Sequence, residues 1–344
     1  MNVLSLFDGM SCGMIALVVG SHNVERYVAF ENETKYATKT ASHNFPDIEQ
    51  RGDVFEADFT EFEGFDIVLA GFPCTKFSVA QKKDRETEPY SGEGWLLFEQ
   101  AWRAVCEAKP KCFLFENNKS MAKTVQSEIS KIVGFAPVCI NSALVSAQNR
   151  QRLYWVGKRN EDGTYSKVDV PQPEDRGILL KDILEVGHDL TSKDKSFCLT
   201  ASYDGACAWN TIERSQRSMV AEHVCAKTGL YTLEVPIYAE ATEWDEYGKP
   251  LKAKSYADGK EYIVYEVKDG QITIKGKTYP IKLKDGFYII RKLTVLECMR
   301  LQTVPEWYEF PVFDSQAYKM LGNGWTVDVI AHILKCLKRE ERWV

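Results

Sequence analysis

Short apolar runs alternate with helical stretches through the first 160 residues. The runs predict strands at 3–7, 24–30, 66–70 and 111–115, and the stretches between them predict helices at 14–19, 98–108 and 120–133. Buried strands that alternate with helices are typical of a parallel sheet covered on both faces. We therefore expect an open α/β fold for the first part of the chain.

The pattern changes after about residue 160. Residues 261–267 and 271–275 alternate apolar and polar positions, and the turn sequence Lys268-Asp269-Gly270 separates them. This arrangement predicts antiparallel hairpins. Helical patterning returns at 294–301 and at 325–342, where one apolar face is shared by Val329, Ile330, Ile333, Leu334 and Leu337. We expect a discontinuous α/β domain of residues 1–180 plus 291–344, with a smaller inserted domain at 181–290.

The composition is that of an ordinary globular protein, with 344 residues of which 44% are hydrophobic and 27% charged. A net charge of −6 argues weakly against a nucleic-acid partner, because phosphates attract Lys and Arg. The charge is uneven, however. Residues 150–159 contain four basic side chains and no acid, and lysines outnumber acids over 251–290. Such runs favour either a phosphate contact or a solvated face.

Several classes of protein are disfavoured by the sequence. The N-terminus has neither a basic segment nor an apolar run long enough for a signal or a membrane span. The ten cysteines form no C-x-x-C pair, and the five histidines are scattered. We expect a reduced, cytoplasmic protein with no metal site and no membrane partner.

A Pro-Cys step follows directly after the apolar run at 66–70. A buried strand that ends there carries a thiol to the carboxyl edge of the sheet, where open α/β folds place their sites. Pro73 fixes the backbone at this point. Cys74 is therefore a candidate nucleophile, since the thiolate is the reactive form of cysteine. An inert buried cysteine is the alternative.

Polar residues follow the first strands as well. The turn Asp8-Gly9-x-x-x-Gly13 lets the backbone approach a ligand and suits an adenosyl or dinucleotide cofactor. Glu31 ends the second strand, where an acid can bind ribose hydroxyls, and Asp53 could accept from an adenine amino group. Each acid alone fits a solvated loop, but acids at successive strand ends favour a cofactor site.

Taken in order, these blocks resemble the cytosine-C5 DNA methyltransferases, above all the animal de novo branch and its phage and bacterial relatives. The resemblance covers residues 1–160 and 291–335 and skips the middle, where the family places its target-recognition domain. It implies a Rossmann-like S-adenosylmethionine-dependent methyltransferase sheet. The matching blocks are Phe7-Asp8-Gly9-x-x-x-Gly13, Glu31, Gly52-Asp53-Val54, Gly71-Phe72-Pro73-Cys74-x-x-Phe77-Ser78, Phe115-Glu116-Asn117, Gln148-Asn149-Arg150-Gln151-Arg152, Arg291-Lys292-Leu293-Thr294 with Glu297, Arg300-Leu301-Gln302 with Pro305, and Leu321-Gly322-Asn323 with Val327.

The resemblance implies methyl transfer to carbon 5 of a flipped-out cytosine in double-stranded DNA by a monomer, with S-adenosylhomocysteine as the product. It assigns Cys74 as the nucleophile that attacks C6. Glu116 is expected to hydrogen-bond N3 and the exocyclic amine, in a protonated form that burial would favour, and Arg152 is expected to contact the base. Arg150 is expected to orient Arg152 or to contact phosphate. The implied cofactor contacts are Phe7, Asp8, Gly9, Gly13, Glu31, Asn32, Asp53, Val54, Pro73, Asn323 and Val327. The candidate DNA contacts are Ser78, Gln148, Arg150, Arg214 and Arg217.

Three other functions remain as alternatives. A transfer-RNA cytosine-C5 methyltransferase would carry Cys-Phe-Thr, which Phe197-Cys198-Leu199-Thr200 matches poorly. A non-catalytic DNA-binding homologue would lack Cys74 or Glu116, and both are present. A nicotinamide-dependent oxidoreductase would explain the first turn and Glu31 but not Cys74, Glu116 and Arg152 in this order.

Overall fold

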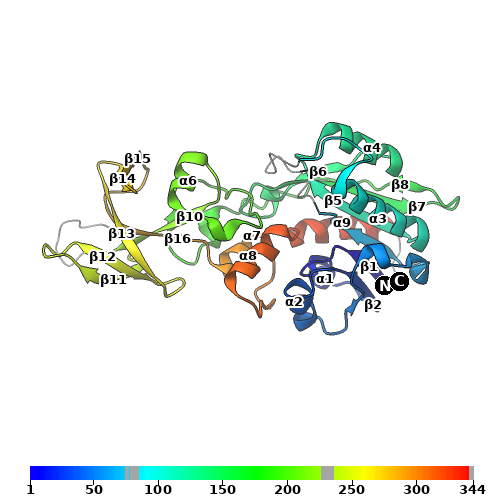
Figure 1. The fold of residues 1–344 in the computed structure, drawn as a ribbon, viewed down its shortest axis with the longest axis horizontal. Helices are drawn as coiled ribbons and strands as arrows, with labels where there is room; N and C mark the ends of the chain where they lie inside the picture. The colour runs from blue at the N-terminus through cyan, green and yellow to red at the C-terminus, as the bar shows by residue number, and fades with distance from the viewer. Residues whose placement is uncertain (74–76, 78–84, 226–235, 341–344) are drawn as a thin grey trace.

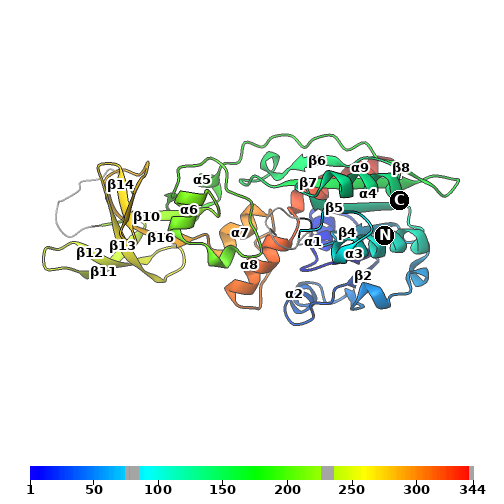
Figure 2. The ribbon, with the colours of Figure 1, turned by 45° about the horizontal axis from the view of Figure 1, so that its top comes forward.

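Two β-sheets lie toward opposite ends of an elongated molecule (Figure 1). The computed structural model describes residues 1–73, 77, 85–225 and 236–340. Helices α7 (Val295–Leu301) and α8 (Asp314–Asn323) lie between the two sheets, as the second view also shows (Figure 2). The C-terminal part of the chain therefore connects the second sheet back to the first.

The first sheet has the strand order β3-β2-β1-β4-β5-β7-β6, with β8 paired to β7. Strands β1 to β5 are parallel, and β7 is antiparallel to its neighbours. The strand order reverses between β1 and β4, and ligands of open α/β sheets bind at the carboxyl ends of the strands beside such a point. The strands are β1 (Asn2–Leu6), β2 (Arg26–Phe30), β3 (Glu49–Gln50), β4 (Ile67–Ala70), β5 (Cys112–Asn118), β6 (Val138–Asn141), β7 (Gln151–Arg159) and β8 (Tyr165–Lys167).

Helices cover both faces of this sheet, as the sequence predicted. Helices α1 (Cys12–Val19) and α9 (Val327–Glu340) share one core with Val3, and helices α3 (Gly92–Ala108) and α4 (Lys123–Val133) share another with Leu4. The predicted apolar face of α9 is fully buried, which confirms that assignment. In the described part of the chain, no helix is long and apolar enough to cross a membrane. The remaining short helices here are α2 (Ala37–Asn44), η1 (Val54–Glu56), η2 (Phe59–Phe62) and η3 (Ser142–Leu144).

Strand β5 is longer than predicted. The sequence placed its end at residue 115, because polar residues follow, yet the strand continues to Asn118 and all of it is buried. The antiparallel partner β7 explains the extension, since it pairs with β5 from Cys112 opposite Lys158 to Asn118 opposite Arg152. Glu116 therefore lies within a strand rather than in a loop.

The second sheet has the order β12-β11-β10-β16-β13-β14-β15, with β9 paired to β10. The predicted hairpin is confirmed: β13 and β14 are antiparallel, and both Asp269 (φ 53°) and Gly270 (φ 68°) have the left-handed backbone that a two-residue turn requires. The elements are β9 (His188–Asp189), β10 (Met219–Val224), β11 (Ala239–Trp244), β12 (Pro250–Ser255), β13 (Glu261–Lys268), β14 (Gln271–Ile274), β15 (Lys277–Pro280), β16 (Gly286–Lys292), α5 (Leu180–Ile183), η4 (Tyr203–Gly205) and α6 (Ala208–Arg214).

A buried cluster of charges joins the second sheet to α7. Arg291 of β16 is fully buried and donates to both carboxylate oxygens of Glu297, at 2.7 and 2.9 Å, and to Glu222 of β10. Burial raises the pKa of Glu222 above its usual range, although the Arg291 guanidinium opposes that shift. Glu297 also closes the capping box of α7 with Thr294. One guanidinium therefore binds two acidic side chains from different elements.

We predict that Arg291→Met lowers the free energy of unfolding by about 3–5 kcal/mol, because it leaves two buried carboxylates without their partner. Lys260→Met is the matched control, since Lys260 and Asp314 form an exposed ion pair at 3.1 Å that should contribute less than about 1 kcal/mol. Urea unfolding measures both. Equal losses in the two variants would contradict the role given to Arg291.

Candidate active site

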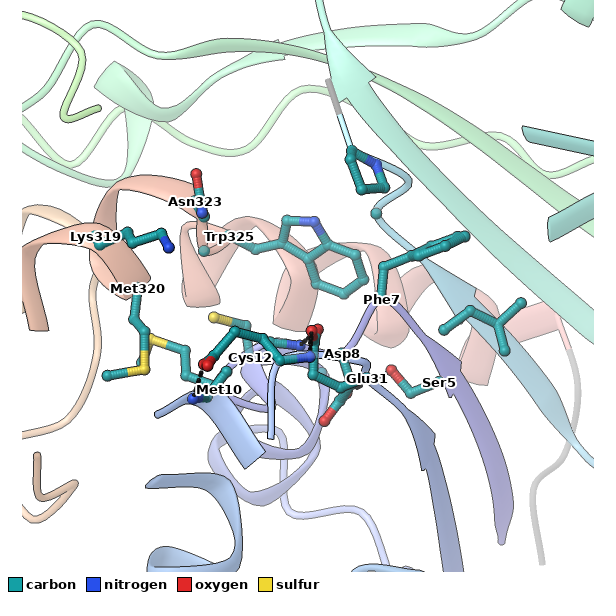
Figure 3. Close-up of a pocket in the computed structure, with 18 of the residues that line it drawn as sticks. Ser5, Phe7, Asp8, Met10, Cys12, Glu31, Lys319, Met320, Asn323 and Trp325 are labelled. Atoms are coloured by element: carbon teal, nitrogen blue, oxygen red, sulfur yellow. Dashed lines mark hydrogen bonds between the residues drawn. The ribbon is translucent and has the colours of Figure 1, made fainter. Parts of the chain in front are cut away.

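A cavity of about 230 Å³ lies at the carboxyl ends of β1 and β4, beside the reversal in strand order (Figure 3). Its walls come from the turn after β1, the end of β2, the segment after β4 and the end of α8. The sequence-predicted residues that line it are Phe7, Asp8, Gly9, Gly13, Glu31, Pro73, Asn323 and the base-binding candidate Glu116.

Asp8 lies at the floor of the cavity, in a turn with left-handed backbone at Phe7, Gly9 and Ser11. Its carboxylate accepts from the hydroxyls of Ser5 (2.6 Å), Ser11 and Tyr27 (2.7 Å). Burial raises the pKa of Asp8 to about 6, even though these three hydrogen bonds lower it. The floor of the cavity therefore gains a negative charge near neutral pH.

Glu31, which follows β2, stabilises the same turn through hydrogen bonds. Its Oε2 accepts from the backbone N–H of Gly9 at 2.8 Å, and its Oε1 accepts from that of Glu33 at 2.8 Å. Gly13 allows α1 to pack closely, because a Cβ there would lie 2.8 Å from Leu69 Cδ1 and 2.9 Å from the Tyr27 hydroxyl. These contacts hold the two acids and the turn as one unit.

Four predicted cofactor residues do not line the cavity. Asn32 is exposed, Val54 packs in the core, and Asp53 accepts from the backbone N–H of Phe55 at 3.0 Å as the N-cap of η1. Val327 is fully buried at the start of α9. Further lining residues near α2 and α8 were not predicted from the sequence: Glu33, Tyr36, Gln316, Lys319, Met320 and Trp325.

Glu116 and Arg152 are brought together by strand register. Glu116 lies opposite Tyr154 and Asn118 opposite Arg152, so Glu116 and Arg152 are diagonal neighbours on one face of the β5–β7 pair. Arg152 Nε is 3.0 Å from Glu116 Oε1, and both side chains are nearly buried. The structure thus pairs two residues that the sequence assigned to the same reaction.

Two further contacts connect Glu116 to its surroundings. The indole N–H of Trp325 donates to Glu116 Oε2 at 3.0 Å. The adjacent Asn117 is fully buried and donates from Nδ2 to the carbonyl of Phe72 at 3.0 Å, which fixes the backbone just before Pro73. Neither role was predicted, because each joins segments that lie far apart in the sequence.

Arg150 is buried, with only 3% of its surface exposed. Its guanidinium donates to the carbonyls of Leu199 (2.7 Å), Gly322 (3.1 Å) and Gly324 (2.7 Å). These bonds direct the Arg150 guanidinium to the protein's own backbone rather than to a phosphate. Gln148 is also fully buried and donates to Leu301 O and Gln302 Oε1, so it does not face a ligand in this structure.

Cys198 lies against both arginines. Its sulfur is 3.4 Å from an Arg150 nitrogen and 3.9 Å from an Arg152 nitrogen. Burial alone would raise the pKa of Cys198, but the two guanidinium charges outweigh burial and the pKa is lowered. The Cys198 sulfur therefore lies between Arg150 and Arg152 and accepts from both.

The candidate DNA contacts have different surroundings. Arg214 is exposed at the end of α6, with its guanidinium 4.7 Å from the centre of the Trp209 ring. Arg217 donates to Gly205 O at 2.6 Å and to Ser202 Oγ at 2.9 Å. Cys74 and Ser78 lie outside the described residues. Across the described ranges, no cluster of three potential metal ligands was found.

Comparisons with known proteins agree on the family. The profile of the family described as C-5 cytosine-specific DNA methylase matches residues 1–339. The Type II methyltransferase M1.ScrFI of Lactococcus lactis subsp. cremoris is 31% identical to this chain. The alignment spans 96% of this chain and 76% of M1.ScrFI. The Type II methyltransferase M.NlaX of Neisseria lactamica is 28% identical, and the alignment spans 98% of this chain and 96% of M.NlaX.

Solved structures agree on the fold. A Spodoptera frugiperda DNMT2 mutant superposes with a TM-score of 0.59 at 18% identity, covering 98% of this chain and 99% of that one. The Schizosaccharomyces pombe Dnmt2 structure gives the same TM-score at 12% identity, with 99% of each chain covered. The predicted α/β methyltransferase fold is therefore confirmed. On the family profile and the identity to M1.ScrFI, the chain belongs to the C-5 cytosine-specific DNA methylases.

Proposed function

We propose that this chain transfers a methyl group from S-adenosylmethionine to carbon 5 of a flipped-out cytosine in duplex DNA, acting as a monomer. Membership in the family gives DNA cytosine methylation as the activity. The position of Glu116 supports the proposed cofactor and mechanism, because Glu116 lines the same cavity as Asp8 and Glu31. A base bound at Glu116 would lie next to a donor held in that cavity.

The chemistry of the cavity fits S-adenosylmethionine. Phe7 and Trp325 supply aromatic surface for the adenosyl group, and Glu31 supplies acceptors for ribose hydroxyls. Asp8 would face the positively charged methionine end, and Lys319 on α8 could pair with its carboxylate. When bound, S-adenosylmethionine supplies an electrophilic methyl group on a sulfonium.

The residues of this chain would prepare the base for that methyl group. Cytosine C5 is a weak nucleophile, so the Cys74 thiolate forms a bond to C6 and pushes the ring electrons toward C5 and N3. Glu116 hydrogen-bonds N3 and the exocyclic amine, and Arg152 holds Glu116 and contacts the base. After methylation, loss of the C5 proton expels Cys74. The target cytosine must first leave the duplex stack, at a cost of about a few kcal/mol.

Region 181–290 is proposed as the target-recognition domain. It contains most of the second sheet and the exposed Arg214 of α6, which stacks near Trp209. An exposed arginine beside an aromatic ring can contact both phosphates and bases. Arg217 is held by its bonds to Ser202 and Gly205, so we propose that it shapes this surface.

The proposed function is tested by incubating the purified chain with labelled S-adenosylmethionine and duplex DNA of varied sequence or transfer RNA. We expect 5-methyldeoxycytidine in the DNA, identified by mass spectrometry of nucleosides. Glu116→Gln should lower the rate by about 10²–10⁴-fold, as expected for loss of acid catalysis. Methylation of transfer RNA with none of DNA would instead support the RNA alternative.

Cofactor affinity should depend on pH through Asp8. Its pKa of about 6 makes the carboxyl neutral below that pH and anionic above it. S-adenosylmethionine carries a net positive charge, so its affinity should rise by about three- to tenfold between about pH 5 and pH 7. Titration calorimetry with Asp8→Asn should show a flat profile over this range. S-adenosylhomocysteine lacks the sulfonium charge and should respond less. The same slope in Asp8→Asn would show that another group titrates.

A further inference from the structure

Trp325 lines the cavity beside the carboxylate of Glu116. It follows the C-terminal end of α8 and lines the cavity near Phe7 (Figure 3). Its indole N–H points at the carboxylate and donates to Glu116 Oε2 at 3.0 Å. One side chain therefore touches both the space for the cofactor and the residue assigned to the base.

The position of Trp325 is fixed by its neighbours. A Cβ at Gly71 would lie only 2.6 Å from Trp325 Nε1, so the indole packs directly on the backbone at the end of β4. The carbonyl of the preceding Gly324 accepts from the buried Arg150 at 2.7 Å. Because its backbone and its ring are both held, Trp325 presents the N–H in one direction.

A role as cavity wall does not account for this arrangement. Any large apolar ring would cover the cavity, whereas an indole N–H must have an acceptor when it is buried. Here the acceptor is the carboxylate already paired with Arg152 through its other oxygen, at 3.0 Å. The two donors hold opposite oxygens of Glu116 and so fix the plane of the carboxylate. One oxygen keeps a further lone pair for the exocyclic amine, and a proton on the carboxyl group can be donated to N3.

We propose that Trp325 is a positioning residue for methyl transfer, which holds Glu116 in the orientation that meets N3 and the exocyclic amine of the cytosine. The inference rests on the proposed function of the site. Without the indole N–H, Glu116 is held by Arg152 at one oxygen and turns about its terminal bond. The base then meets the carboxylate in fewer productive orientations.

The test uses Trp325→Phe in the full chain, with Trp307→Phe as the matched control. Trp307 is about half exposed and lies outside the cavity. We expect Trp325→Phe to slow single-turnover methylation of duplex DNA by about tenfold, the size expected for a hydrogen bond to a charged group. The dissociation constant for S-adenosylmethionine should change by less than about threefold. Trp307→Phe should change neither value.

A double-variant measurement separates positioning from a purely structural role. If Trp325 acts through Glu116, Trp325→Phe should slow the Glu116→Gln variant by less than about threefold. Should Trp325→Phe unfold or lose cofactor binding, replacement of the Trp325 indole by benzothiophene keeps a bicyclic aromatic ring and exchanges the N–H for a sulfur that cannot donate. That replacement should show the same tenfold loss.

Four outcomes would overturn the inference. Equal slowing by Trp325→Phe in the native and the Glu116→Gln backgrounds would show that it does not act through Glu116. If Trp325→Phe weakens only the binding of S-adenosylmethionine, or if the benzothiophene replacement is fully active, Trp325 serves only to line the cavity. If the native chain binds S-adenosylmethionine but methylates no DNA, the proposed function fails first, and the positioning role falls with it.

Discussion

The buried guanidinium of Arg150 is the contact on which the arrangement of the site depends. It donates to the carbonyl of Leu199 and to those of Gly322 and Gly324, which belong to two segments far apart in the sequence. A buried charge is costly unless its donors are paired, so these two segments must meet around it. The close approach of Gly322 to the backbone of Thr200, where a Cβ would lie at 2.2 Å, follows from this gathering. The end of α8 is thereby fixed beside the sheet.

The environment of Glu116 follows from that placement. Strand register brings Arg152 to one oxygen of the carboxylate, and the fixed end of α8 brings the Trp325 indole to the other. Asn117, the next residue on β5, holds the carbonyl of Phe72 before the Pro-Cys step. The cavity that contains Asp8 and Glu31 opens on the same group. A donor site and a base site can thus share one rigid wall.

The sequence predicted those parts of the site that depend on strand ends. Asp8, Glu31 and Pro73 follow parallel strands, whose carboxyl ends meet at one edge, and they line one cavity. The turn at Asp269-Gly270 was also predictable, because the left-handed backbone there depends on these two residues and not on distant contacts. Trp325 and Asn117 could not be found in this way, since their partners are set by packing between distant segments. Gln148 and Arg150 were expected to contact DNA, but segments remote in the sequence bury both.

The central claim is that a cytosine held at Glu116 becomes bonded to Cys74. Duplex DNA with 5-fluorocytosine at the target tests it directly, because fluorine cannot leave as the C5 proton does. After reaction with S-adenosylmethionine, peptide mass spectrometry should place the modified base on Cys74, and Cys74→Ser should form no complex that survives denaturation. The same complex in Cys74→Ser, or a base attached to Cys198 beside Arg152, would contradict this account.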